Sequence, residues 1–161
     1  MESVYIETSV IGYLTSPLSG DLVTAAHQRI TREWWEMESH HFSLYISKLV
    51  YDEITLDDIG QAETRCNFVA HLPQIAVSDE SRELASVYSA RIPVLRDAKA
   101  DALHLAISTL EGLEYLLTWN CRHIARASVR QKLVEINTEL RLGWPQICTP
   151  EELSHGDSSL G

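Results

Sequence analysis

Four side chains with oxygen donors stand out in this sequence because together they could hold a divalent cation. Glu7 and Asn120 each follow a short apolar run, whereas Glu53 and Asp101 lie in segments with helical spacing. Three carboxylates that meet at one place would repel one another unless a cation lies between them. Oxygen-only ligands favour Mg²⁺ or Mn²⁺ over Zn²⁺. Such a cation can lower the pKa of a water and neutralise a phosphate under attack, which is the chemistry of phosphate-ester hydrolysis.

Each of these residues also has a purely structural interpretation. Glu7 could be a solvated acid at the end of a strand, and Glu53 an exposed helix acid. Asp101 opens the otherwise apolar stretch Asp-Ala-Leu-His-Leu-Ala-Ile, and an acid near a helix N-terminus is favoured by the helix dipole. One acid alone is therefore weak support for a site, and the hypothesis depends on their convergence.

The elements expected to position these residues alternate between strands and helices. Short runs of β-branched and aromatic residues predict strands at residues 3–7, 42–47, 75–77, 115–119 and 147–148. Apolar residues recur at helical spacing over residues 10–14 and 21–38, from residue 48 onwards, and over residues 58–71, 79–91, 98–111 and 122–142. This alternation predicts a parallel sheet covered on both faces. Functional groups of such sheets gather beyond the carboxyl ends of the strands, where Glu7 and Asn120 lie.

Composition predicts one globular domain. The chain has 161 residues, of which 45% are hydrophobic and 22% charged, and it contains no internal repeat. We expect one domain over residues 1–153, followed by a flexible Ser/Gly-rich tail at 154–161. The cysteines, Cys66, Cys121 and Cys148, are odd in number and lack a C-x-x-C spacing, which favours a reducing cytoplasm. No membrane helix, secretory signal or nucleotide-binding glycine motif is found.

The charge is unevenly distributed. The chain carries a formal net charge of −10, which argues against a broad nucleic-acid footprint. One local basic strip follows Asn120, where Arg122, Arg126 and Arg130 recur every four residues and predict one helical row. Arginine suits phosphate oxygens, so this row could hold a nucleic-acid backbone beside the carboxylates. It could equally be a solvated face balanced by acids further along.

Several other residues near these motifs have competing interpretations. Thr118 and Trp119 border the expected site, and Trp119 could stack on a base or pack in the core. His104 resembles half of a carboxylate–histidine metal pair, but the second half is missing, so we expect a helix histidine with a local partner. His123 could extend the phosphate strip or be plain surface, and Cys121 lacks the groups that would activate a nucleophile.

Four segments in order resemble the motifs of the PIN-domain family, and within it the VapC-like toxins of bacterial toxin–antitoxin pairs. They are Val4-Tyr-Ile-Glu-Thr-Ser-Val-Ile, Ser47-Lys-Leu-Val-Tyr-Asp-Glu-Ile, Asp101-Ala-Leu-His-Leu-Ala and Leu116-Leu-Thr-Trp-Asn-Cys-Arg-His-Ile-Ala. The likeness runs from about residue 3 to residue 153. It implies a three-layer α/β/α sandwich with a mainly parallel sheet, and a ribonuclease with one or two Mg²⁺ or Mn²⁺ ions. It further implies a homodimer and inhibition by a small antitoxin.

Matched by position, Glu7, Glu53, Asp101 and Asn120 occupy the four metal and catalytic positions of that family. Thr8 matches the hydroxyl residue after the first acid; it is expected, with Thr118, Arg122 and Arg126, to contact substrate. The sequence departs from the family at two positions, since Glu7 stands where Asp is usual and Asn120 where Asp is frequent. The expected charge of the site is therefore −3 instead of −4.

The function predicted from these features is metal-dependent endoribonuclease activity, with RNA as the substrate and an antitoxin as the partner. A non-catalytic PIN-fold module that binds RNA or protein is the main alternative, because of the two departures. A Mg²⁺ phosphohydrolase acting on small phosphate esters ranks last, since its usual nucleophilic Asp at the first strand end is replaced by Glu7.

Overall fold

The computed structural model of the chain describes residues 1–56 and 59–154. Its strands are β1 (Ser3–Ile6), β2 (Ser43–Ser47), β3 (Gln74–Ile75), β4 (Tyr115–Leu117) and β5 (Gln146–Cys148). Its α-helices are α1 (Thr8–Thr15), α2 (Leu22–Met37), α3 (Lys48–Thr55), α4 (Ile59–Val69), α5 (Asp79–Arg91), α6 (Lys99–Leu110) and α7 (Ala127–Glu139). The predicted tail falls almost entirely outside the described residues.

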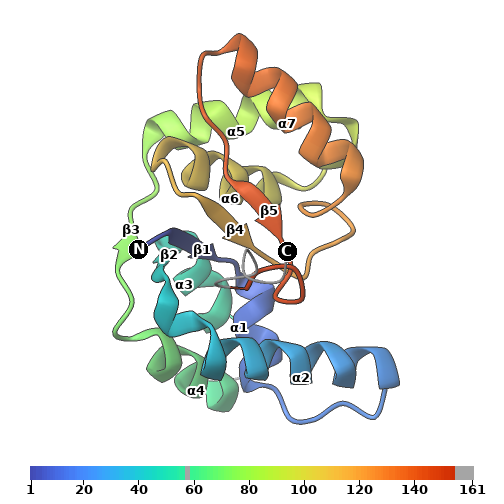
Figure 1. Cartoon of the computed structure of the whole chain (residues 1–161). Coiled ribbons are helices and arrows are strands. Elements are labelled where there is room, and N and C mark those ends of the chain that lie inside the picture. The colour runs from blue at the N-terminus through green and yellow to red at the C-terminus, as the bar shows by residue number, and fades with distance from the viewer. Residues whose placement is uncertain (57–58, 155–161) are drawn as a thin grey trace.

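The five strands form one parallel sheet in the order β3-β2-β1-β4-β5. Helices α1 to α4 cover one face of the sheet, and α5, α6 and α7 cover the other (Figure 1). The chain crosses from one side of β1 to the other after β3, so the strand order reverses between β1 and β4. The three-layer α/β/α sandwich with a parallel central sheet, predicted from the sequence, is confirmed.

Local sequence signals account for where the helices begin. The hydroxyl of Ser47 accepts a hydrogen bond from the backbone N–H of Val50 at 3.1 Å and so caps α3, as predicted. Ser78 and Ser81 form a reciprocal capping box at the start of α5, and Pro93 follows that helix. These caps fix the residues at which α3 and α5 begin, after β2 and β3.

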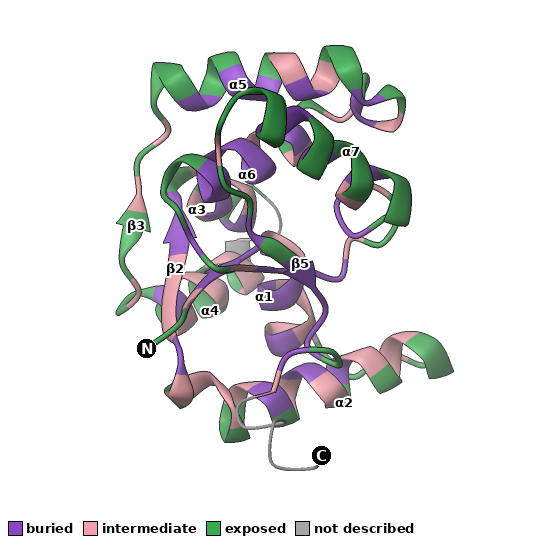
Figure 2. Ribbon diagram, turned by 45° about the horizontal axis from the view of Figure 1, so that its top comes forward, coloured by how far each residue is buried: buried purple, intermediate pink, exposed green. Residues whose placement is uncertain are grey.

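Helix α6 is buried over most of its length. A continuous run within it, from His104 to Thr109, is buried, and it lies between the sheet and α5 (Figure 2). The segment contains the polar residues His104, Ser108 and Thr109 as well as apolar ones, and all are buried. A charged or polar residue on α6 must therefore find a partner inside the protein or lie at the end of the helix.

Two expectations about the bounds of the elements are wrong. The helix predicted over residues 122–142 begins only at Ala127, and residues 121–125 form a turn instead. The strand predicted at residues 75–77 covers Gln74–Ile75. Within the described part of the chain, no helix is long and apolar enough to cross a membrane.

Candidate active site at the carboxyl edge of the sheet

The candidate site lies where the strand order reverses, between the carboxyl ends of β1 and β4. The backbone N–H of Glu7 donates to the carbonyl of Leu117 at 3.1 Å, which joins the two strand ends directly. Open α/β sheets bind ligands at such a reversal, because the connections leave the two strand ends in opposite directions. Glu7 follows β1 and Asn120 follows β4, so both reach this edge.

Glu7 binds within the protein through both carboxylate oxygens. Oε2 accepts the backbone N–H of Ser9 at 2.7 Å, and Oε1 accepts the hydroxyls of Ser9 at 2.8 Å and Thr118 at 2.5 Å. Glu7 is the N-cap of α1 and is only 4% exposed. These bonds stabilise its charge and tie the start of α1 to the segment after β4.

Glu53 lies on α3 and joins a hydrogen-bond chain that runs through the core. Its Oε1 accepts the Thr8 hydroxyl at 2.7 Å and lies 2.6 Å from Nε2 of His104. The other ring nitrogen of His104 lies 2.7 Å from the Tyr5 hydroxyl, which is itself 2.7 Å from the Ser47 hydroxyl. Glu53 Oε2 receives no hydrogen bond from the residues that the structure describes.

The Glu53–His104 pair shifts the pKa of both groups. Burial pushes the pKa of Glu53 upward, but the hydrogen bond and charge of His104, with the Thr8 hydroxyl, outweigh it and lower the pKa. Burial pushes the pKa of His104 downward, but the hydrogen bond to Glu53 and the charges of Glu7, Glu53 and Asp101 raise it overall. The pair therefore favours a carboxylate beside an imidazolium.

Asp101 lies in the first turn of α6 and contacts the segment after β4. Its Oδ1 accepts the side-chain amide of Asn120 at 3.1 Å, and its Oδ2 lies 2.9 Å from Nδ1 of His123. The side-chain oxygen Oδ1 of Asn120 accepts the backbone N–H of His123 at 3.0 Å. Asp101 and His123 keep 20% and 29% of their side-chain surface exposed, so this part of the site is open to solvent.

The structure brings all four predicted site residues to one edge. The Thr118 hydroxyl links them, because it donates to Glu7 and accepts the backbone N–H of Asn120 at 2.9 Å. Asp101 and His104 are three residues apart on α6 and therefore share a face, so Asp101 lies on the side of α6 that contacts Glu53 through His104. The four residues lie at one edge of the sheet, and their role as ligands of one cation stays a prediction. Thr8 and Thr118 bind the carboxylates of Glu53 and Glu7 at this edge.

The donor chemistry fits a hard cation at two of the carboxylates. Glu53 and Asp101 are partly exposed, whereas Glu7 is buried. Both Glu7 oxygens accept hydrogen bonds, and both Asp101 oxygens contact Asn120 or His123. Within residues 1–56 and 59–154, no three His, Cys, Asp or Glu side chains are grouped as ligands of one ion. Mg²⁺ commonly takes one or two carboxylates and completes its shell with water and substrate phosphates. The residues therefore suit a cation that is bound by one or two carboxylates together with water and substrate, and they do not form a complete set of protein ligands.

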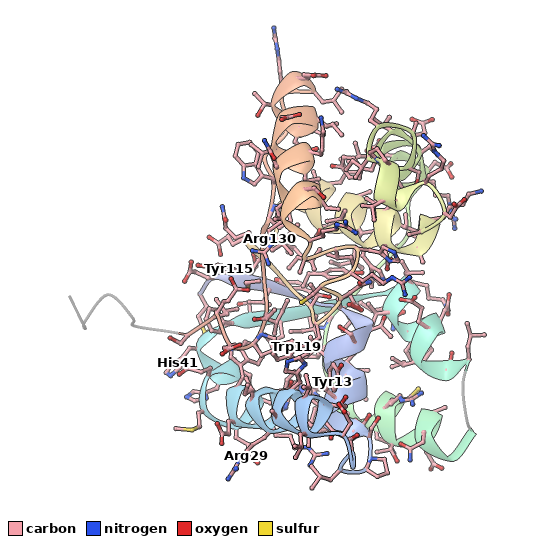
Figure 3. The ribbon with its side chains drawn as sticks, turned by 90° about the vertical axis from the view of Figure 1, so that its right-hand side faces the viewer. Tyr13, Arg29, His41, Tyr115, Trp119 and Arg130 are labelled. Atoms are coloured by element: carbon pink, nitrogen blue, oxygen red, sulfur yellow. The ribbon has the colours of Figure 1, made fainter. Side chains whose placement is uncertain are left out.

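The predicted row of arginines is wrong as a helical face. Arg122 and Arg126 precede α7, and only Arg130 belongs to the helix. Arg130 lies in the first turn of α7, at its sheet-facing end (Figure 3), with its guanidinium 3.7 Å from Glu152. Arg122 and Arg126 are exposed, and neither has an ion pair among the residues that the structure describes. They still follow Asn120 directly and remain near the site by chain connectivity.

Trp119 packs in the core and does not present a face to a ligand. It is 9% exposed, donates its indole N–H to Thr31 at 2.7 Å and stacks on His27 with ring centroids 4.0 Å apart. Tyr13 lies edge-on to Trp119, as Figure 3 shows. Of the two interpretations of Trp119, the packed one is confirmed.

Sequence reasoning missed the partners of the carboxylates. His104 was expected to have a local partner, but it bonds Tyr5 and Glu53, which are far away in sequence. The sequence suggests either a phosphate contact or plain surface for His123, whereas in the structure it pairs with Asp101. One signal was available for His104: an ionisable residue inside an apolar helix needs a buried partner.

Solved structures share this fold. A chain of VapBC2 from Rickettsia felis, bound to a DNA fragment from its promoter, covers 91% of this chain and 98% of its own length, with a TM-score of 0.53 and 13% identity. A chain of FitAB bound to an IR36 DNA fragment covers 95% and 99%, with a TM-score of 0.58 and 10% identity. A chain of VapBC-1 from nontypeable Haemophilus influenzae covers 93% and 99%, with a TM-score of 0.53 and 12% identity. Comparison of the sequence with models of protein families and with curated proteins gave no match.

Proposed function

We propose that this protein is a metal-dependent endoribonuclease and the toxin of a toxin–antitoxin pair. The observation that carries the proposal is the meeting of Glu53, Asp101 and Asn120 with the buried Glu7 at the strand-order reversal. The fold shared with chains of VapBC and FitAB assemblies supports the same function. The PIN-family motifs found in the sequence at these same residues support it independently.

We assign the cation, Mg²⁺ or Mn²⁺, to Glu53 and Asp101. When bound there, it would lower the pKa of a water and neutralise charge on the phosphate under attack. Glu7 has a different role in this proposal, because its hydrogen bonds fix the position of Thr118 and Ser9 at the edge of the site. Asn120 orients Asp101 by donating its side-chain N–H to Asp101 Oδ1. Its own side-chain oxygen accepts the backbone N–H of His123 in the turn that follows.

The remaining residues would bind and orient the RNA. Arg122 and Arg126 are exposed cations directly after Asn120, so we assign them to phosphates on either side of the scissile bond. The Thr8 hydroxyl donates to Glu53 and holds that carboxylate from the α1 side. His123, held through Nδ1 by Asp101, keeps part of its ring exposed, where the ring can contact the RNA.

The test is cleavage of RNA by the purified chain with Mg²⁺ or Mn²⁺ and with a chelator. We expect cleavage only with metal, and Asp101→Asn to lower the rate by about 100-fold, as expected for losing one pre-organised electrostatic group. Asp97→Asn is the matched control, because Asp97 is an exposed carboxylate four residues earlier. Cleavage that is unaffected by Asp101→Asn would reject the assigned role.

The alternative is a PIN-fold module that binds RNA or protein without cutting. One observation favours it, because every carboxylate already has a partner within the chain. Both Glu7 oxygens accept hydrogen bonds, Glu53 is paired with His104, and Asp101 is paired with His123. A calorimetric titration with Mn²⁺ separates the two functions. Heat of binding that disappears in Asp101→Asn supports the nuclease, and a silent titration supports the binding module.

The antitoxin and homodimer belong to the same proposal. Co-expression with the product of a neighbouring short reading frame, followed by sedimentation of the purified complex, tests both. We expect a complex that contains two copies of this chain and has lost the RNA cleavage. A monomeric chain that binds no such product would reject this part of the proposal.

A further inference from the structure

We propose that His104 is a positioning residue for the Glu53 carboxylate, an inference that rests on the proposed function. His104 Nε2 holds Glu53 Oε1 and thereby keeps Oε2 of the same carboxylate available for a cation. The contact is 2.6 Å long and joins α6 to α3 across the site. Glu53 has three rotatable side-chain bonds, so without such a contact its carboxylate would sample several positions.

The ring of His104 is itself held in place from the opposite side. Nδ1 lies 2.7 Å from the Tyr5 hydroxyl, and Tyr5 packs edge-on against the ring with centroids 5.7 Å apart. The Ser47 hydroxyl lies 2.7 Å from that of Tyr5 and accepts the backbone N–H of Val50. His104 is 1% exposed, and both Tyr5 and Ser47 are fully buried. The ring has no solvent to turn toward, so its orientation is fixed by the core.

Hydrogen-bond accounting gives the direction of the contact. In a neutral ring, the hydrogen lies on Nε2 because the Glu53 carboxylate that faces this nitrogen can only accept, and the Tyr5 hydroxyl then donates to Nδ1. In a protonated ring, both nitrogens carry hydrogen, and Tyr5 accepts from Nδ1 while donating to Ser47. Nε2 therefore donates to Glu53 in both charge states, and the proposal does not depend on which is present.

Two donors converge on the same Glu53 oxygen. The Thr8 hydroxyl donates to Oε1 at 2.7 Å from α1, and His104 donates to it from α6. Neither contacts Oε2, and the Glu53 side chain keeps 29% of its surface exposed. Partners that orient a metal-ligating carboxylate are part of many metal sites, and their loss weakens metal binding. His104 is thus more than a buried ring that needs a partner, because the partner is the carboxylate that the site exposes.

The test uses two amide substitutions that differ in one methylene group. Gln at position 104 can place its side-chain N–H near the present Nε2, whereas Asn is too short to reach Glu53. Tyr88→Phe is the control, because it removes a buried hydroxyl that bonds Asn137 at 2.6 Å, in a network separate from the site. For each full-length variant, Mn²⁺ binding is measured from the free-ion paramagnetic resonance signal without RNA. RNA cleavage is measured in parallel for kcat and KM.

We expect His104→Asn to weaken Mn²⁺ binding and lower kcat by about 10- to 100-fold, the usual cost of losing a partner of a metal ligand. The KM for RNA should stay unchanged, and His104→Gln should recover most of both losses. Tyr88→Phe should lower thermal stability and leave both values as in the wild type. Equal behaviour of the two amide variants, or no loss in His104→Asn, would overturn the proposal.

Two further measurements separate this proposal from the proposed function. If the wild type binds Mn²⁺ but cleaves no RNA, the nuclease proposal fails and the Mn²⁺ affinities still decide the role of His104. If it does neither, crystal structures decide, since Glu53 should move in His104→Asn and stay in His104→Gln. Should His104→Asn not fold, nitrogen-15 NMR of the wild-type ring decides: a solvent-protected hydrogen on Nε2 supports the proposal, and its absence rejects it.

Discussion

Ser9 binds the carboxylate of Glu7 twice, through its backbone N–H at 2.7 Å and through its hydroxyl at 2.8 Å. The same hydroxyl accepts the backbone N–H of Trp119 at 2.9 Å. Glu7 therefore acts as a helix cap and as a link between the ends of β1 and β4. The PIN-domain family, which the sequence resembles, usually has Asp at this position. The longer side chain of Glu can fold back over the first turn of α1 to make these contacts.

Glu7→Gln should destabilise the protein because every group that contacts the Glu7 carboxylate donates a hydrogen bond to it. The amide group keeps one acceptor oxygen, so at least one of the donors from Ser9 and Thr118 loses its partner. An unsatisfied buried donor costs about 1–3 kcal/mol, and we expect a loss of that size in the free energy of unfolding in urea with a chelator present. The control is Asp21→Asn at the exposed N-cap of α2, where Asn caps as well as Asp and the loss should be close to zero. Equal effects of the two substitutions would contradict the linking role of Glu7.

The Glu53–His104 pair should make stability depend on pH in both directions. The folded pKa of Glu53 is lowered, so its contribution is present above the unfolded pKa and is lost as the pH falls through the folded value. The folded pKa of His104 is raised, so its contribution is present below the unfolded pKa and is lost as the pH rises through the folded value. Stability from the pair is therefore greatest between the unfolded pKa of Glu53 and the unfolded pKa of His104, and it declines beyond each of them toward the folded values.

The contribution of His104 is measured by thermal melts in chelator over the pH range in which that contribution is lost. We expect the difference in melting temperature between the wild type and His104→Gln to shrink as the pH rises from about 6 to 9, since the unperturbed pKa of His is about 6.5. Arg91→Gln is the control, because it breaks an exposed ion pair with Glu139 that does not titrate in that range. A difference that stays constant over the range would show that the charge of His104 contributes nothing.

Much of the fold could be predicted because the signals are local. The β-branched run before Glu7 predicts β1, and the hydroxyl of Ser47 before an apolar helical pattern predicts the cap of α3. The meeting of the four site residues followed from topology, since strand ends of a parallel sheet share one edge. No contact had to be known for that step.

The hydrogen-bond partners could not be predicted because they join distant parts of the chain. His104 bonds residues 99 and 51 positions away, and helical spacing carries no information about such pairs. The arginine row failed for a local reason. The side-chain oxygen of Asn120 accepts the backbone N–H of His123, and its backbone carbonyl accepts that of Ala125. These two hydrogen bonds form a turn where the sequence predicts helix.

Asn120→Asp should make the protein less stable without metal and tighten its binding of metal. The Asn120 amide donates to Asp101 at 3.1 Å, and a carboxylate there would replace that bond with repulsion between like charges. We expect a loss of about 1 kcal/mol in stability in chelator, comparable to one hydrogen bond, and a return toward wild-type stability in saturating Mn²⁺. Asn67→Asp on the exposed face of α4 adds the same charge elsewhere and should show neither effect. A variant whose stability does not respond to Mn²⁺ would argue against a cation beside Asp101.

Replacing Arg122 and Arg126 together by Ala should weaken RNA binding without slowing the chemical step. Both side chains are exposed and have no ion pair within residues 1–56 and 59–154, so they are available to phosphates. We expect KM to rise by about fivefold with kcat unchanged, since two exposed charge contacts of about 0.5 kcal/mol each together contribute about 1 kcal/mol. The dependence of log affinity on log salt should become shallower by about 0.7 for each lost contact with single-stranded RNA. Arg29→Ala with Arg91→Ala gives the same change in charge at residues that are already paired, with Glu33 and Glu139. If this control pair raises KM as much, the effect belongs to net charge, and Arg122 and Arg126 have no special place on the RNA.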